Sequence, residues 1–237
     1  MTSAVGGCIQ KGDTVPQRQF LATLPPAAAH LLRVAHDLSF ARDLETVVVT
    51  ARTAARALTG AGVGAVYASP LERARASAAL VAAPHHLEVR TEPAFREMAF
   101  GEWEGLTRAE VALRFPREMA VWMAAPHLVQ PPGGERLGDV AARVVAGLAA
   151  LSEAHAGQTV VLVSHAIVSR LVVLAALGLG PERLWSVDAS PAGITEIEYV
   201  EGWTTVHRMN TLIHLESMVG EPAEGSAVGS GLGGVTA

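Results

Sequence analysis

The feature that most constrains the fold is an apolar, β-branched run at residues 159–163, followed directly by Ser164 and His165. A run of this length and composition is typical of a strand buried on both faces, as in parallel sheets that helices cover. A second short apolar run, residues 63–68, ends at Ser69-Pro70, and proline fits the first turn of a following helix. Strands that alternate with helices in this way predict an α/β fold with a mostly parallel sheet.

The remaining periodic segments agree with this fold class. A long amphipathic helix is predicted over residues 135–154, with Leu137, Val140, Val144 and Leu148 on one stripe. Residues 194–200 and 204–209 are predicted to form a closing hairpin around Gly202. Further helices are predicted over residues 71–83, 107–115, 116–124 and 167–177.

The ends of the chain differ in character from its middle. Residues 1–24 show no clear period and are predicted to be disordered. Residues 25–61 are predicted to be helical, because Pro25-Pro26 can open a helix, residues 31–40 have helical spacing, and a second stretch over 44–58 ends at Gly60. Residues 62–216 are predicted to form the main domain. Residues 217–237 lack aromatic residues and are predicted to be a disordered tail.

Composition excludes several classes of protein. Charged residues make up only 17% of the 237 residues and the net charge is −5, which argues against the basic stripe that a nucleic-acid partner requires. No apolar run is long enough for a membrane span, and no secretory signal is evident. Cys8 is alone, so neither an intramolecular disulfide nor a cysteine zinc site is expected. We therefore expect a cytoplasmic protein without a metal, a membrane partner or a nucleic-acid partner.

Three side chains are candidates for phosphate chemistry. Arg73 lies one turn into a helix, where free N–H groups already attract anions and a guanidinium adds a fork for phosphate oxygens. Glu97 lies in a loop among apolar neighbours, which tend to raise the pKa of a carboxyl as a general acid requires. His165 follows the buried strand, at the sheet edge where ligands bind in α/β folds. Taken singly, each also has an ordinary reading, as a surface arginine, a loop carboxylate or a structural histidine.

Jointly these residues resemble a known pattern. Residues 69–74 (Ser-Pro-Leu-Glu-Arg-Ala), the acid loop 97–105, the turn 132–135 (Pro-Gly-Gly-Glu) and residues 161–166 resemble ordered motifs of the histidine phosphatase superfamily, also called phosphoglycerate mutase-like. The resemblance covers residues 62–215 or so, and the Gly-Glu-Trp-Glu-Gly loop is more similar to the small-molecule phosphatases, such as the ribazole phosphatases, than to the glycolytic mutases.

The resemblance implies a three-layer α/β sandwich and hydrolysis of a phosphomonoester through a phosphohistidine. It implies that Arg73 and His165 bind the phosphoryl group and that Glu97 protonates the leaving oxygen. It also implies a small phosphorylated metabolite as the substrate and no cofactor, and it leaves a homodimer open.

The attacking histidine of that family stands in an Arg-His-Gly triplet, which this chain lacks. None of the nine histidines is preceded by arginine or followed by glycine. Residues 31–38, 43–45 and 54–61 instead resemble the opening of a GAF domain, a sensory module. The first central strand of the sheet is therefore expected to be missing or replaced, and each unpaired buried backbone group would cost roughly 1–3 kcal/mol. Residues 47–50 are β-branched enough to fill the gap.

Three functions remain open at this point. The first is a phosphatase whose activity is impaired because the nucleophilic histidine is absent. The second is a non-catalytic protein that binds a phosphate ligand or a partner. The third is a truncated or fused gene product with a GAF-like sensory head.

Overall fold

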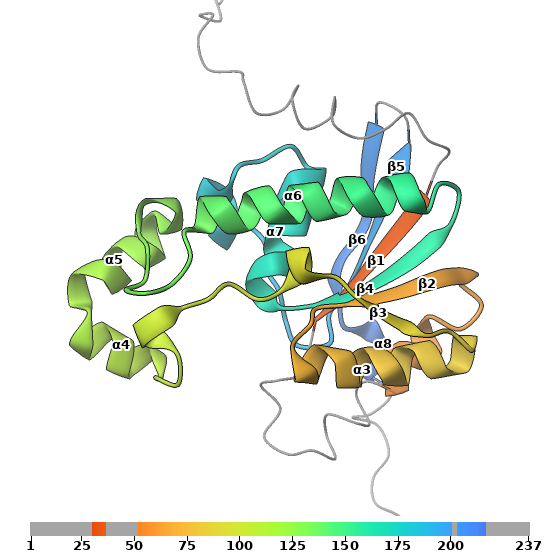
Figure 1. Ribbon diagram of the computed structural model, residues 1–237, viewed down its shortest axis with the longest axis horizontal. Coiled ribbons are helices and arrows are strands. Elements are labelled where there is room, and N and C mark those ends of the chain that lie inside the picture. Colours follow the sequence, from red (N-terminus) through yellow and green to blue (C-terminus); the bar gives the residue numbers. More distant parts are fainter. Residues whose placement is uncertain (1–29, 37–51, 201–202, 217–237) are drawn as a thin grey trace, which may run out of the picture.

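The computed structural model describes residues 30–36, 52–200 and 203–216. In this part of the chain, strands form a six-stranded sheet in the order β3-β2-β4-β1-β5-β6. Neighbours from β3 to β1 run parallel, whereas β5 is antiparallel to β1 and β6 is antiparallel to β5. The predicted α/β fold with a mostly parallel sheet is confirmed (Figure 1).

The elements of the sheet and its helices follow the chain in alternation. The strands are β1 His30–His36, β2 Val63–Ala68, β3 Val89–Thr91, β4 Thr159–Ser164, β5 Ile194–Val200 and β6 Trp203–Thr211. The α-helices are α3 Glu72–Ala82, α4 Arg108–Arg114, α5 Pro116–Ala124, α6 Leu137–Ala154, α7 Ala166–Ala176 and α8 Ile213–Glu216. Short 3-10 helices are η1 Ala83–His85, η2 Pro93–Phe95, η3 Gly101–Trp103, η4 Pro126–Leu128 and η5 Pro181–Ser186.

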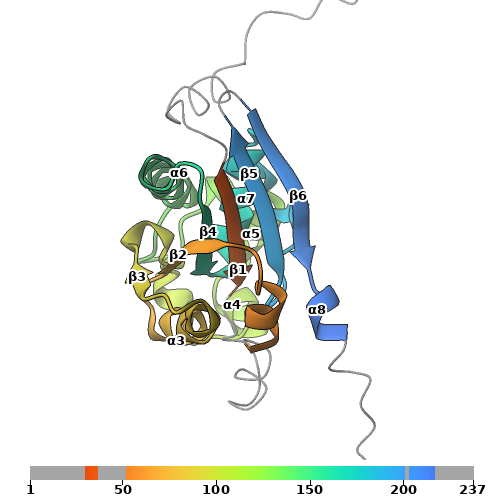
Figure 2. The same ribbon diagram turned by 90° about the vertical axis from the view of Figure 1, so that its right-hand side faces the viewer.

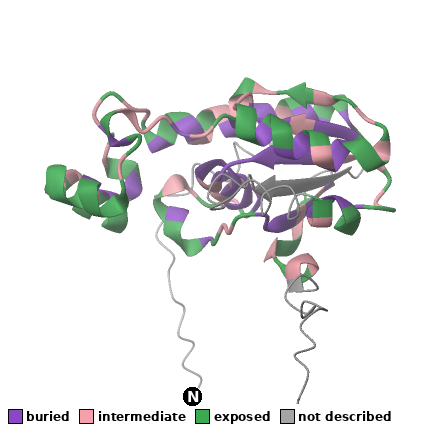
Figure 3. Cartoon of the chain, turned by 90° about the horizontal axis from the view of Figure 1, so that it is seen from below, coloured by how far each residue is buried: buried purple, intermediate pink, exposed green. Residues whose placement is uncertain are grey.

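Helices cover the sheet on both faces and so make three layers. The strand β4 shows why, since Val160 and Leu162 join the core packed against α6 and α7, whereas Val161 and Val163 join the core packed against α3. The alternation along β4 therefore buries both of its faces, as its uninterrupted apolar run predicted. Helices α4 and α5 project from one end of the sandwich, and most of their surface is exposed (Figures 1 and 3).

Strand β1 occupies the centre of the sheet, between β4 and β5 (Figure 2). Its residues pair in parallel with β4 from Leu31 opposite Thr159 to His36 opposite Ser164. They also pair antiparallel with β5, ending with Ala35 opposite Ile194. The central strand, which was expected to be missing or replaced, is present and is formed by residues 30–36.

The predicted helix over residues 31–40 is wrong for residues 31–36, which form most of β1. The physical reason is pairing, because β4 and β5 each offer unpaired backbone groups that only an extended segment can satisfy. The remainder of that predicted helix and the alternative filler, residues 47–50, lie outside the described residues, as do the segments predicted to be disordered. The second predicted helix is present where described, over residues 52–57, and the chain turns at Gly60 with a φ of 81°. The GAF resemblance and the domain boundaries stay predictions.

The other predicted elements agree with the structure. Helices α3 to α7 lie where spacing placed them, and β5 and β6 form the predicted antiparallel hairpin. Across the described ranges, no helix has the length and apolarity needed to cross a bilayer.

We expect backbone amides of residues 31–35 to exchange with deuterium as slowly as those of residues 160–163. Both segments are hydrogen-bonded on two sides, whereas the edge strand β6 has one partner and should exchange faster. Hydrogen-exchange mass spectrometry of the native full chain measures this. Exchange of residues 31–35 that is faster than exchange of β6 would show that this segment does not occupy the centre of the sheet.

Candidate active site

The site lies at the carboxyl edge of two neighbouring parallel strands. Strand β2 is followed by Ser69 and strand β4 by His165, and both side chains are almost fully buried. His165 Nε2 lies 2.7 Å from Ser69 Oγ. The Ser69 N–H donates to the carbonyl of Val163 at 3.0 Å, which fixes the end of β2 against β4. Parallel pairing therefore joins two residues 96 positions apart in the sequence.

Arg73 reaches the same histidine from helix α3. Its Nη2 lies 3.4 Å from His165 Nδ1. Because a guanidinium has donors only, Nδ1 must accept in this contact, and the ring proton of a neutral imidazole is then on Nε2, where it donates to Ser69 Oγ. Ser69 Oγ also accepts the Leu71 N–H at 3.3 Å. The arrangement fixes the orientation of the imidazole and holds a positive charge beside it.

Glu97 reaches the site from the acid loop, at the start of helix α7. Its Oε2 accepts the N–H of Ile167 at 3.4 Å, and its Oε1 accepts the N–H of Met98 at 2.9 Å. Ile167 lies two residues after His165, so the carboxylate and the imidazole share one helix N-terminus. The structure therefore brings Arg73, Glu97 and His165, the three residues singled out in the sequence, to one edge of the sheet.

A partly buried ion pair holds the loop that carries Glu97. Arg143 of α6 donates from Nη1 to Ala94 O at 2.7 Å and from Nη2 to Glu97 O at 3.4 Å. The same guanidinium pairs with Glu135 at 3.2 Å, and Glu135 Oε2 accepts the Ala99 N–H at 2.8 Å. The loop is thus fixed on both sides of Glu97.

The charge on Glu135 is itself stabilised by this arrangement. Burial would raise the pKa of the Glu135 carboxyl, but hydrogen bonds from Arg143 and Ala99, with the charges of Arg143 and Arg96, lower the pKa below its ordinary value. Sequence reasoning noted Glu135 only as part of a turn and as the start of the predicted helix 135–154. It missed Arg143. The one feature of the sequence that could have indicated the Arg143–Glu135 contact is their separation of eight residues, which places two helical residues on the same face.

The acid loop 97–105 and the turn 132–135 are joined by backbone hydrogen bonds beside Glu97. The Glu102 N–H donates to Pro132 O at 2.9 Å, and the Glu135 N–H donates to Ala99 O at 2.8 Å. Gly101 has a φ of +55°, and a Cβ at this position would overlap Pro132 O. Glycine is therefore required at residue 101 by both backbone conformation and space.

The end of strand β1 lies at the same edge. His36 is its last residue, in register with Ser164 and thus one position before His165. Sequence reasoning had no reason to select His36, because it lacks the Arg-His-Gly context and falls in a stretch with helical spacing. Among the described residues, no group of three or more His, Cys, Asp or Glu side chains is placed to hold a metal ion.

Comparison with known proteins relates the chain to one family. Residues 45–212 match the family model described as histidine phosphatase superfamily (branch 1). Phosphoserine phosphatase 1 of Hydrogenobacter thermophilus is 32% identical over 165 residues, which cover 70% of this chain and 78% of that protein. The adenosylcobalamin/alpha-ribazole phosphatase of Escherichia coli is 27% identical over 154 residues, covering 65% and 76%.

Solved structures share the fold of this chain. Bacillus stearothermophilus YhfR superposes with a TM-score of 0.72 at 24% identity, covering 78% of this chain and 99% of that chain. The family match begins at residue 45, so strand β1 lies outside it.

We expect Glu135→Gln to lower the free energy of unfolding at neutral pH by about 1–3 kcal/mol, because Arg143 loses its charged partner. The pKa of Glu135 is lowered in the folded state, so its contribution is present above the ordinary value of 4.5 and is lost as pH falls through the lower folded pKa. Urea unfolding is measured between pH 3 and 7, in steps of about one unit. As the pH falls, the free energy of unfolding of the variant should decrease less than that of the wild type. The exposed Glu88→Gln is the control, and an unchanged pH dependence in Glu135→Gln would contradict the ion-pair role.

We also expect Gly101→Ala to destabilise the protein more than Gly105→Ala. Both glycines have a positive φ, which costs alanine roughly 1–2 kcal/mol. Only at Gly101 would the added Cβ meet neighbouring backbone, whereas nothing lies within 4 Å at Gly105. Thermal unfolding of the two variants measures the difference, and equal losses would show that the acid loop and the turn do not lie as close as described.

Proposed function

The chain belongs to the histidine phosphatase superfamily (branch 1), and on that premise we propose that its site binds the phosphoryl group of a small phosphomonoester. The observation that carries the proposal is the contact of Arg73 Nη2 with His165 Nδ1, at 3.4 Å across 92 residues of sequence. Arg73 offers an oriented cation, and α7 offers a helix N-terminus that favours negative charge. Both lie at the sheet edge where α/β proteins bind ligands.

Each of the three residues has a defined part in this proposal. Arg73 and His165 bind the phosphoryl oxygens. Glu97 protonates the leaving oxygen, and its carboxyl is positioned for this by the N–H of Ile167 and by the loop that Arg143 holds. These roles account for why residues from α3, the acid loop and the end of β4 converge.

The hydrolytic reaction of the family requires one further group. An imidazole nitrogen attacks phosphorus, a P–N bond forms, and the P–O bond breaks as the leaving oxygen takes a proton; water then cleaves the P–N bond. In this chain no histidine has the Arg-His-Gly context, and β1 ends with His36 one register position before His165. We therefore propose that the protein binds phosphomonoesters and that its hydrolysis is strongly impaired, which makes phosphate-ligand binding its retained activity.

The ligand class rests on the relatives and on composition. Relatives are named as phosphatases of phosphoserine and of alpha-ribazole, which are small molecules with unlike leaving groups. The net charge of −5 does not suit a nucleic-acid partner. A small phosphorylated metabolite of the cytoplasm, bound without a cofactor, is the proposed ligand.

Binding is tested by calorimetry with inorganic phosphate. We expect Arg73→Ala to weaken binding at least about tenfold, since a charge-assisted hydrogen bond is worth about 1.5–3 kcal/mol and 1.4 kcal/mol is tenfold. Arg75→Ala is the matched control, because Arg75 lies on the same helix and pairs with Glu72. Equal affinity of wild type and Arg73→Ala would refute the phosphate site.

Hydrolysis is tested with p-nitrophenyl phosphate. We expect turnover near background that His165→Ala leaves unchanged. Robust turnover that His165→Ala abolishes would contradict the proposed impairment. In that event, loss of turnover in His36→Ala would assign the attack to His36.

A further inference from the structure

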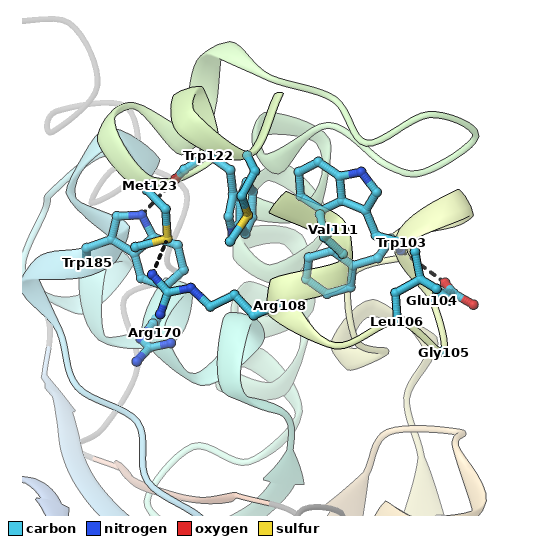
Figure 4. A pocket seen from close by; sticks show the side chains of 12 residues that line it. Trp103, Glu104, Gly105, Leu106, Arg108, Val111, Trp122, Met123, Arg170 and Trp185 are labelled. Carbon is cyan, nitrogen blue, oxygen red and sulfur yellow. Dashed lines mark hydrogen bonds between the residues drawn. The ribbon is translucent and has the colours of Figure 1, made fainter. Parts of the chain in front are cut away.

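A cavity of about 570 Å³ lies beside the phosphate site, between α4, α5, α7 and η5 (Figure 4). Its volume falls in the range of small-molecule sites. Aromatic and apolar side chains form most of its wall, including Trp122, Met123 and Trp185, and two arginines, Arg108 and Arg170, also line it. Part of the lining, Phe100 and residues 103–105, belongs to the acid loop noted in the sequence, whereas no motif indicated the other segments that join it.

The aromatic wall has a fixed geometry. The indole N–H of Trp185 donates to Trp122 O at 2.9 Å. The two rings meet edge to face, with centroids 5.6 Å apart and planes at 86°. Trp122 is nearly buried, whereas Trp185 is 39% exposed and so offers surface to a ligand. A planar ring has preformed partners here.

Arg170 connects the cavity to the acid of the phosphate site. Its guanidinium carbon lies 5.2 Å from the Trp185 ring centroid, and its Nε donates to Val187 O at 2.8 Å. Burial lowers the pKa of Arg170, and the negative charges of Asp188 and Glu97 oppose that shift. Arg170 lies on α7 three residues after Ile167, whose N–H donates to Glu97 Oε2, so the cavity adjoins the place where the leaving oxygen would be protonated.

Arg108 supplies a cation with no carboxylate partner among the described residues. Its Nη2 contacts Met123 Sδ at 3.1 Å, and a thioether sulfur is only a weak acceptor. Glu104, the acidic residue of the lining, accepts the N–H of Phe100 at 3.0 Å. The charge of Arg108 is thus available to an anion on a bound molecule.

We propose that this cavity binds the leaving group of the phosphomonoester, and that the leaving group is an aromatic ring carrying a second anion. The inference rests on the proposed function, since it places the phosphoryl group at Arg73 and His165 and the ester oxygen at Glu97. The ring packs against Trp122 and Trp185, and the anion pairs with Arg108. Arginine suits this task because its planar fork matches a carboxylate and remains charged at every working pH.

The first experiment compares phenyl phosphate with 4-carboxyphenyl phosphate by calorimetry on the full chain. We expect the carboxylated ester to bind about tenfold more tightly, equivalent to about 1.4 kcal/mol. Arg108→Gln should abolish this preference. Arg117→Gln, at an exposed position of α5 outside the lining, should retain the preference. Equal affinities in wild type, or a preference that survives Arg108→Gln, would overturn the proposal.

A second measurement separates this inference from the phosphate site. 4-Hydroxybenzoate carries the ring and the anion without phosphorus, and its binding should quench tryptophan fluorescence. We expect equal binding to wild type and Arg73→Ala, and loss of binding in Arg108→Gln. Hydroxybenzoate binding without phosphate binding would refute the proposed function and leave the cavity assignment intact, whereas phosphate binding without hydroxybenzoate binding would refute the cavity assignment alone.

Discussion

Backbone pairing at the centre of the sheet is the constraint on which the rest of the structure depends. Strand β4 is buried on both faces and its hydrogen-bonding groups must be met by β2 on one side and β1 on the other. The edge formed by β2 and β4 places Ser69 and His165 within hydrogen-bonding distance. Strand β1, which lies outside the residues that the family model matches, completes this sheet by pairing with β4 and β5.

The acid side of the site depends on a different kind of contact. Glu97 lies on a loop without regular pairing, and the Arg143–Glu135 pair positions that loop through its backbone. A partly buried pair of this kind adds little net stability, but removal of one member leaves the other without its partner, so the pair fixes geometry more than it adds stability. The positions of His165 and Glu97 therefore depend on two separate supports, the sheet edge for His165 and the ion pair for Glu97.

Sequence reasoning succeeded where the signal is local or ordered along the chain. It predicted β2, β4 and α6 from apolar patterning, and it singled out Arg73, Glu97 and His165, which the structure brings to one edge. It was wrong about residues 31–36, because their spacing fits a helix and only the partners 128 positions later, such as Thr159 for Leu31, favour a strand. It missed Arg143, whose loop contacts lie 46 and 49 residues away, and the cavity, whose two tryptophans are 63 residues apart.

The site brings a guanidinium, a carboxyl and an oriented imidazole to one sheet edge, beside the cavity proposed for the leaving group, and the chain has no Arg-His-Gly triplet. The most direct measurement mixes the full chain with a 32P-labelled phosphomonoester, quenches the mixture with alkali, and quantifies label bound covalently to protein. The account predicts no label above that of His165→Ala. Base-stable, acid-labile label approaching one phosphate per chain would demonstrate a phosphohistidine and contradict it.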